Sequence, residues 1–178
     1  MSHRSTNNDK PRIYVADLAA YNAGRLHGAW IDATLSPDEI NEEIQKILKS
    51  SPEPDAEEYA IHDYEGFGGL HLSENPDIDS ISQVANLIQE HGPLFAAVVE
   101  HFGGTQYLDD AVQAMEESYQ GEYDEISDWA EQFAKDTGAS MDNYENYIDW
   151  ERVANDAEMG GDIFTVELDG KVHVFWSH

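Results

Sequence analysis

An 85-residue stretch of this chain carries charge of one sign only. Residues 50–134 contain 20 Asp or Glu and no Lys or Arg. Like charges repel one another over roughly 8–10 Å at physiological salt, so a compact fold must hold these groups on its surface. Apolar residues are interleaved among the acids at regular spacing, unlike a low-complexity acidic tail. The stretch therefore predicts an ordered scaffold that displays anionic groups at fixed positions.

The whole chain has a formal charge of −28, with 37 Asp and Glu against nine Lys and Arg. Its 11% of aromatic residues supplies enough apolar area for real cores. A small domain is kept soluble by a net charge of magnitude about 2–8, so the excess indicates a positively charged partner. Adaptation to a salt-rich environment is the alternative that the composition leaves open.

Several classes of protein do not fit the composition. The absence of cysteine excludes disulfides and thiolate metal sites. No run of 18 apolar residues is long enough to span a membrane, and residues 1–10 lack the apolar core of a signal peptide. Nucleic acid and anionic membranes would both repel the chain. We therefore expect a cytoplasmic protein that binds neither.

The first third of the chain predicts a small α+β unit. Strands are expected at residues 12–18, 26–33 and 58–64, with turns at 21–24 and in the glycine-rich stretch 66–69. Ser36, Pro37 and Glu39 form a helix-start signature, so a helix should run from there to about Leu48.

The rest of the chain predicts helices followed by a β-hairpin. Asp79 or Ser80 should cap a helix that ends at Gly92, and Pro93 should start another that ends at Gly103. Further helices are expected at 105–119, with Leu108, Ala111, Val112, Met115 and Tyr119 inward, at 124–136, with Ile126, Trp129, Ala130 and Phe133 inward, and at about 144–159. Residues 162–168 and 171–176 should pair around Asp169-Gly170 as a type I′ hairpin.

The candidate functional residues are the carboxylates of two of these helices and of the short segment between them. Residues seven apart on an α-helix stack roughly 10 Å apart along one face, and no lysine or arginine is expected on the outer face to offset them. The predicted anionic surface comprises Asp109, Asp110, Glu116, Glu117, Glu122, Asp124, Glu125, Asp128 and Glu131.

The amount of charge is on the scale of a DNA-binding groove. Duplex DNA carries about one negative charge per 1.7 Å of axis, so the charge of this chain corresponds to roughly 48 Å, or about 14 base pairs. A groove lined with Lys and Arg attracts such a surface whatever its sequence, because phosphate contacts carry no sequence information.

Two long motifs resemble the ArdA antirestriction proteins. The first joins RIYVADL at 12–18, YNAG at 21–24 and GAW at 28–30. The second is EYAIHDYE at 58–65. Residues 128–138 and 146–150 resemble later segments of the same family, so the likeness covers roughly residues 11–178.

This resemblance implies an elongated α+β chain of three small domains. They would comprise an N-terminal α+β domain at 11–76, a helical middle domain at 77–119 and a C-terminal α+β domain at 120–178 that ends in the hairpin and supplies a homodimer contact. Residues 1–10 would be a mobile tail. The formal charges of the three domains are −9, −8 and −12, so all three are acidic.

The resemblance also implies a function without catalysis. ArdA proteins are DNA mimics, carried on mobile genetic elements, that inhibit Type I restriction–modification enzymes by occupying the DNA site on the methyltransferase core. The implied partner is that enzyme, and no cofactor is implied. An acidic regulator that sequesters a basic DNA-binding protein is the alternative from a second class.

Metal and enzyme chemistry find little support in the motifs. No HExxH pair occurs, and the EF-hand-like spacing at Asp77 and Asp79 lacks the glycine that a calcium loop needs at position six. Carboxylate pairs carry no signal for a hydrolase in so acidic a chain. We therefore expect no catalytic residue, no metal site, and structural roles in the core for Trp30 and Trp129.

Overall fold

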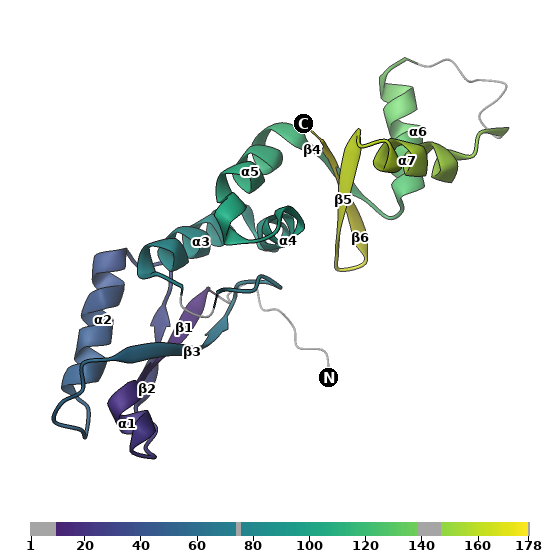
Figure 1. Ribbon diagram of the computed structural model, residues 1–178. Coiled ribbons are helices and arrows are strands. Elements are labelled where there is room, and N and C mark those ends of the chain that lie inside the picture. Colours follow the sequence, from purple (N-terminus) through teal and green to yellow (C-terminus); the bar gives the residue numbers. More distant parts are fainter. Residues whose placement is uncertain (1–9, 74–75, 139–146, 178) are drawn as a thin grey trace. The chain divides into compact units, whose positions relative to one another are not determined.

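A computed structural model describes residues 10–73, 76–138 and 147–177, which divide into two compact units, Met1–Leu108 and Asp109–His178. Helices and two small antiparallel sheets alternate along the chain, which confirms the expected α+β class (Figure 1). The three-domain division implied by the resemblance stays a prediction, and the tail predicted at 1–10 lies, apart from Lys10, outside the described residues. Each unit is described by itself below.

The first unit is built on a three-stranded sheet. Its strands are β1 (Arg12–Asp17), β2 (Gly28–Asp32) and β3 (Tyr59–Glu65), in the order β2-β1-β3. Tyr14 lies opposite Trp30 on β2 and opposite Asp63 on β3. All three predicted strands are thus confirmed, with ends that differ by one or two residues.

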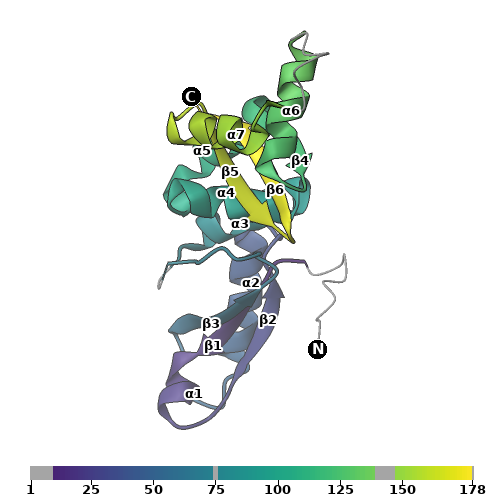
Figure 2. The same cartoon turned by 90° about the vertical axis from the view of Figure 1, so that its right-hand side faces the viewer.

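A short helix takes up the first half of the segment that the sequence predicts as a turn after β1. Figure 2 shows this helix, α1 (Leu18–Asn22), directly after β1. It begins because the Asp17 carboxylate accepts the N–H groups of Ala19 and Ala20. The turn itself follows at Ala23 and Gly24, and Gly24 takes a φ of 82°.

Helix α2 (Pro37–Lys49) lies along one face of the sheet and contacts β1 and β2. The Ser36 hydroxyl accepts the N–H of Glu39, so the predicted helix start is confirmed. The buried residues Ile40, Ile44, Ile47 and Leu48 recur at helical spacing and form the face turned to the core. The expected end at Leu48 is off by one residue.

The glycine-rich stretch forms the predicted turn, and it is packed rather than open to solvent on all sides. Phe67 and Leu70 are almost completely buried. A Cβ on Gly68 would lie 2.8 Å from the Cβ of Ala96, and its φ of 62° also favours glycine. Glycine at this position therefore allows the chain to lie directly against the helix that contains Ala96.

Two helices complete the first unit. Asp77 caps α3 (Ile78–His91) by accepting the N–H of Ser80, so the cap lies two residues before the earliest predicted position. Helix α4 (Pro93–Phe102) follows after Gly92, and the two helices pack together. Both predicted ends, at Gly92 and Gly103, are confirmed.

The segment predicted as one helix at 105–119 has three parts. A 3₁₀ turn, η1 (Thr105–Tyr107), leads into α5 (Leu108–Gln113) and then into a π-helical turn, η2 (Ala114–Ser118). Leu108 and Ala111 are buried as expected. Tyr119 belongs instead to a strand that the sequence analysis missed, β4 (Tyr119–Tyr123).

The second unit packs helices α6 (Ile126–Asp136) and α7 (Trp150–Met159) against a second sheet. Its strands β5 (Ile163–Leu168) and β6 (Lys171–Trp176) form the predicted hairpin, and β4 pairs with β6, giving the order β4-β6-β5. The first residues of the predicted helix at 144–159 lie outside the described residues.

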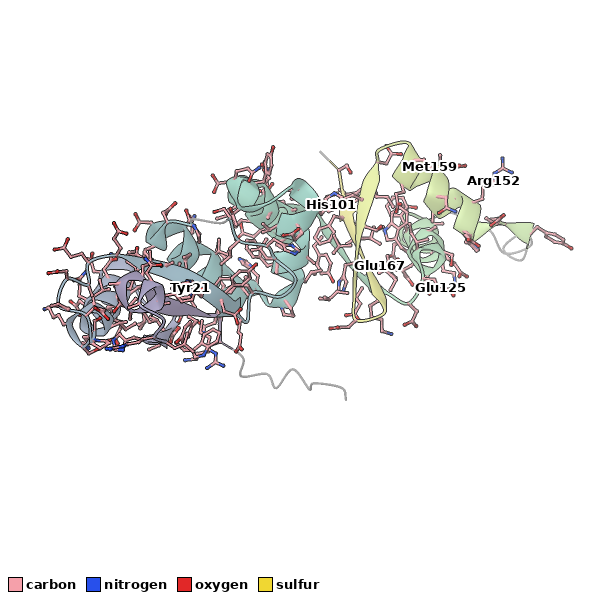
Figure 3. All side chains as sticks on the ribbon, turned by 60° about the horizontal axis from the view of Figure 1, so that its bottom comes forward. Tyr21, His101, Glu125, Arg152, Met159 and Glu167 are labelled. Atoms are coloured by element: carbon pink, nitrogen blue, oxygen red, sulfur yellow. The ribbon has the colours of Figure 1, made fainter. Side chains whose placement is uncertain are left out.

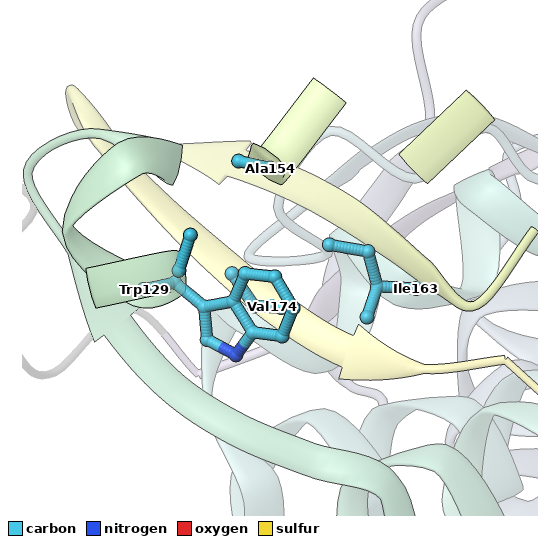
Figure 4. Close-up of a cluster of buried hydrophobic side chains, with 5 residues drawn as sticks. Trp129, Ala154, Ile163 and Val174 are labelled. Carbon is cyan, nitrogen blue, oxygen red and sulfur yellow. The ribbon is translucent and has the colours of Figure 1, made fainter. Parts of the chain in front are cut away.

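The core of this second unit centres on a tryptophan. Trp129 packs with Ala154, Ile163 and Val174, which come from α7 and both strands of the hairpin (Figure 4). Trp129 is buried as predicted, whereas Trp30 in the first unit keeps 36% of its surface exposed. The expectation that both tryptophans belong to cores is therefore wrong for Trp30.

Candidate functional site

Carboxylates cover the surface of both units. Four of the 37 Asp and Glu lie outside the described residues, and of the remaining 33, 28 are exposed, four are half-buried and only Asp17 is buried. Most acids therefore contribute to the field outside the protein rather than to interactions inside it.

Eight of the nine predicted site residues are exposed, and Glu131 is half-buried. Asp109 and Asp110 lie in the first turn of α5, and Glu116 and Glu117 lie on the π-helical turn. A π turn closes its hydrogen bonds over five residues instead of four. Stacking of the pair at 109–110 on the pair at 116–117 requires an uninterrupted α-helix. The π turn interrupts the helix between the two pairs, so the expected regular spacing is not kept.

The other predicted residues surround the start of α6. Glu122 lies on β4, opposite His173 of β6. Asp128 accepts the backbone N–H of Glu125 at 3.1 Å, which caps the helix. Glu125 and Asp128 thus stabilise the start of α6 while both residues stay exposed to solvent. Figure 3 shows Glu125 at the start of this helix and Glu167 on the second sheet.

Two lysines offset part of this charge, contrary to expectation. Lys171 of β6 pairs with Asp124, and Lys135 of α6 pairs with Glu131 at 3.2 Å. Both pairs are solvent-exposed, so each contributes about 1 kcal/mol or less. Asp124 and Glu131 are therefore the two predicted residues whose charge is partly balanced.

Some carboxylates outside the predicted set have a structural task. Asp77 accepts the N–H and the hydroxyl of Ser80, and these hydrogen bonds hold the pKa of Asp77 below its usual range. Asp149 caps α7 by accepting the N–H of Arg152. Helix N-termini favour such anions because the helix dipole is positive there.

A buried histidine lies beneath this surface on β6. The Nδ1 atom of His173 is 2.7 Å from the hydroxyl of Tyr119. Burial lowers the pKa of His173, although Glu122 and Asp169 oppose that effect. This lowered pKa favours the neutral imidazole, which adds no positive charge to the surface above it.

A comparison with protein-family models decides the family. The model described as "Antirestriction protein (ArdA)" matches residues 13–170, which is nearly the whole chain. The chain belongs to the ArdA family. Membership implies an antirestriction function and an interaction with restriction–modification enzymes. A search of curated proteins finds no match.

Two findings on this ArdA chain concern other kinds of site. Among the described residues, no group of three or more His, Asp or Glu is placed to hold a metal ion. In the same part of the chain, no helix is long and apolar enough to cross a membrane.

The acidic surface of this ArdA chain is wider than the nine predicted residues. In the second unit it also includes the exposed Asp136, Asp149, Glu151, Asp156, Glu158, Asp162, Glu167 and Asp169. The nine predicted residues come from the part of the chain without Lys or Arg. The acids of α7 and the hairpin also occupy polar positions, but Arg152 and Lys171 lie among them, so the sequence marks them less clearly.

Proposed function

We propose that this ArdA chain is a DNA mimic that occupies the DNA-binding groove of a Type I restriction–modification enzyme. The observation that carries the proposal is the display of 28 exposed carboxylates over both compact units, each of which has its own packed core. The protein blocks restriction of incoming DNA by exclusion and performs no chemistry itself.

The physical basis is the exchange of one polyanion for another. A DNA-binding groove is lined with Lys and Arg and gains free energy when condensed counterions leave the duplex. Carboxylates on a rigid frame attract the same basic groups and accelerate association by electrostatic steering. Ordered elements support them here, because predicted site residues lie on α5, β4 and α6.

Further parts of the proposal follow from family membership. The chain acts as a homodimer, which doubles the length of duplex that it can replace. Its three domains form an elongated anionic track, and it works in the cytoplasm, where restriction enzymes meet DNA carried by mobile genetic elements.

The proposal is tested by titrating a complex of a Type I methyltransferase and fluorescent duplex DNA with the protein. Displacement of the DNA is expected, with an apparent affinity that falls steeply from about 50 to 200 mM salt. Failure of excess protein to displace DNA from a panel of Type I enzymes would sink the proposal. Capture of a small basic DNA-binding protein instead of restriction subunits would favour the sequestering regulator.

Graded neutralisation separates a mimic from an enzyme. A single Asp109→Asn change should weaken binding by less than about fivefold, because one exposed charge contributes about 1 kcal/mol or less. The further changes Asp110→Asn, Glu116→Gln and Glu117→Gln should weaken binding step by step and reduce its salt dependence. Gln83→Asn, at an exposed position of α3, is the matched uncharged control, and abrupt loss at one carboxylate would contradict mimicry.

A further inference from the structure

The sheet of the first unit has an aromatic face that its own helix does not use. Ile13, Val15 and Ile31 are buried on the side of α2. Successive strand residues point to opposite faces, so Arg12, Tyr14 and Trp30 lie on the other side. The solvent face of an antiparallel sheet normally carries polar residues. Here it carries a tryptophan and a tyrosine as direct cross-strand neighbours.

Neighbouring side chains hold Trp30 in place on this face. The Tyr14 ring meets it edge-on, with centroids 5.4 Å apart, and the Arg12 guanidinium lies 4.4 Å from its ring centroid. Arg12 is fixed in turn by Glu65 of β3, whose Oε2 accepts from Nε at 2.9 Å and from Nη2 at 2.5 Å. Side chains from all three strands thus preorganise one aromatic group.

A glycine keeps Tyr14 close to the sheet. A Cβ on Gly28 would lie 2.4 Å from the carbonyl oxygen of Val15 and 2.9 Å from the Tyr14 hydroxyl oxygen. Tyr14 therefore lies across Gly28 and supports Trp30 from the side. A depression of about 630 Å³ opens beside them, with Arg12, Trp30, Asp32 and Glu65 among its lining residues.

The charges around the aromatic face determine what kind of partner fits it. Asp32, Asp63 and Glu65 lie opposite Arg12 or Tyr14 in the sheet and so share the same face. Within the three strands Arg12 is the single Lys or Arg, and Glu65 already pairs with it. Lys10, which also lines the depression, is one further cation beside these three carboxylates. The face is therefore aromatic at its centre and anionic at its margin, which suits a basic protein surface and repels nucleic acid.

We propose that this face, comprising Arg12, Tyr14, Trp30 and Glu65, is a second contact for the target enzyme. It receives an Arg- or Lys-bearing surface of that enzyme against Trp30. A desolvated, preorganised aromatic group flanked by polar residues is the usual anchor of a protein interface. The inference rests on the proposed function. It adds an apolar contact through Trp30, whose contribution to the affinity for the enzyme does not depend on salt.

The test compares the salt dependence of binding between variants of the full chain. The DNA-displacement titration is repeated from about 50 to 200 mM salt for the wild type, Trp30→Ala and Trp30→Phe. Trp30→Ala should weaken binding by about thirtyfold at every salt concentration, the loss typical of an interface anchor, and leave the slope unchanged. Trp30→Phe should recover part of that affinity. Tyr21→Ala removes another exposed aromatic from the same unit and should change binding less than about twofold.

Oxidative footprinting of the wild-type chain gives a second readout that needs no folded variant. Trp30 should be protected from oxidation in the complex with the methyltransferase and reactive in the free chain. Equal reactivity in both states would overturn the inference, as would a Trp30→Ala variant that binds like the wild type.

Three outcomes that contradict a part of the argument are distinguishable. Protection of Trp30 that follows the concentration of the chain alone would show that a second copy covers the face, and would refute an enzyme contact. If the wild-type chain displaces no DNA, the proposed function itself fails. If it displaces DNA and Trp30→Ala does so equally well, only the second contact fails.

Discussion

At the scale of single residues, Asp17 shows what happens to a carboxylate that this acidic chain does bury. It is completely buried at the end of β1 and caps α1 through the N–H groups of Ala19 and Ala20. Desolvation alone would raise the pKa of Asp17. The Ser51 hydroxyl, the hydrogen bonds from these two N–H groups and the nearby His27 outweigh it and lower the pKa.

We predict that Asp17→Asn lowers the free energy of unfolding by about 1–2 kcal/mol at pH 7, because it removes charge-assisted hydrogen bonds. A group whose folded pKa is lowered stabilises the fold above its unfolded pKa of about 3.9. The difference between wild type and variant should therefore shrink as the pH falls through the folded pKa. Urea unfolding at a series of pH values measures it, with the exposed Asp55→Asn as control.

At the scale of elements, the hairpin of β5 and β6 depends on a turn in which two consecutive residues have positive φ. Asp169 has a φ of 52° and Gly170 a φ of 77°, as a type I′ turn requires. A Cβ on Gly170 would meet no atom within 4 Å. A side chain there would be opposed by backbone strain alone and not by a clash.

Gly170→Ala should therefore destabilise the second unit by about 1 kcal/mol, the cost of a left-handed backbone for a residue with a Cβ. Asp169→Asn is the matched control and should be neutral within about 0.5 kcal/mol, because asparagine tolerates this conformation. Hydrogen exchange of the β5 and β6 amides measures both. Equal protection in Gly170→Ala and the wild type would show that the turn does not limit the stability of the hairpin.

At the scale of the whole molecule, the net charge of −28 opposes folding. Among the described residues, five Lys or Arg side chains form ion pairs within 4.0 Å of a carboxylate, at Arg12, Arg25, Lys46, Lys135 and Lys171. The unfolded chain separates its charges farther than the folded chain does. Self-repulsion is therefore larger in the folded state, and salt should reduce it.

We predict that the Tm rises as the salt concentration increases from about 0.01 to 0.1 M, over which the screening length falls from about 30 to 10 Å. Each kcal/mol of repulsion removed corresponds to roughly 4–8 °C for a domain of 60–100 residues. Calorimetry measures the change. The fourfold variant with Asp109→Asn, Asp110→Asn, Glu116→Gln and Glu117→Gln should depend less on salt, and an identical dependence would contradict the repulsion argument.

Local signals in the sequence determined most elements and the character of the surface. Ser36 with Glu39, Pro93 after Gly92 and Asp169-Gly170 each act through backbone groups a few residues away, so they can be recognised without a fold. Exposure of eight of the nine candidate carboxylates was predictable for a related reason: a charge stays in water unless folding supplies compensation.

Tertiary structure decided the features that depend on distant partners. Strand β4 exists because β6, some 50 residues later, supplies its hydrogen bonds. Gly68 lies against Ala96 of α4, a helix some 25 residues later in the chain, beside the buried Phe67. Lys171 reaches Asp124 only after β6 has paired. Trp30 follows the apolar pattern of a core residue, yet α2 covers the other face of its sheet. A pattern shows that a side chain is apolar, but only packing decides whether anything covers it.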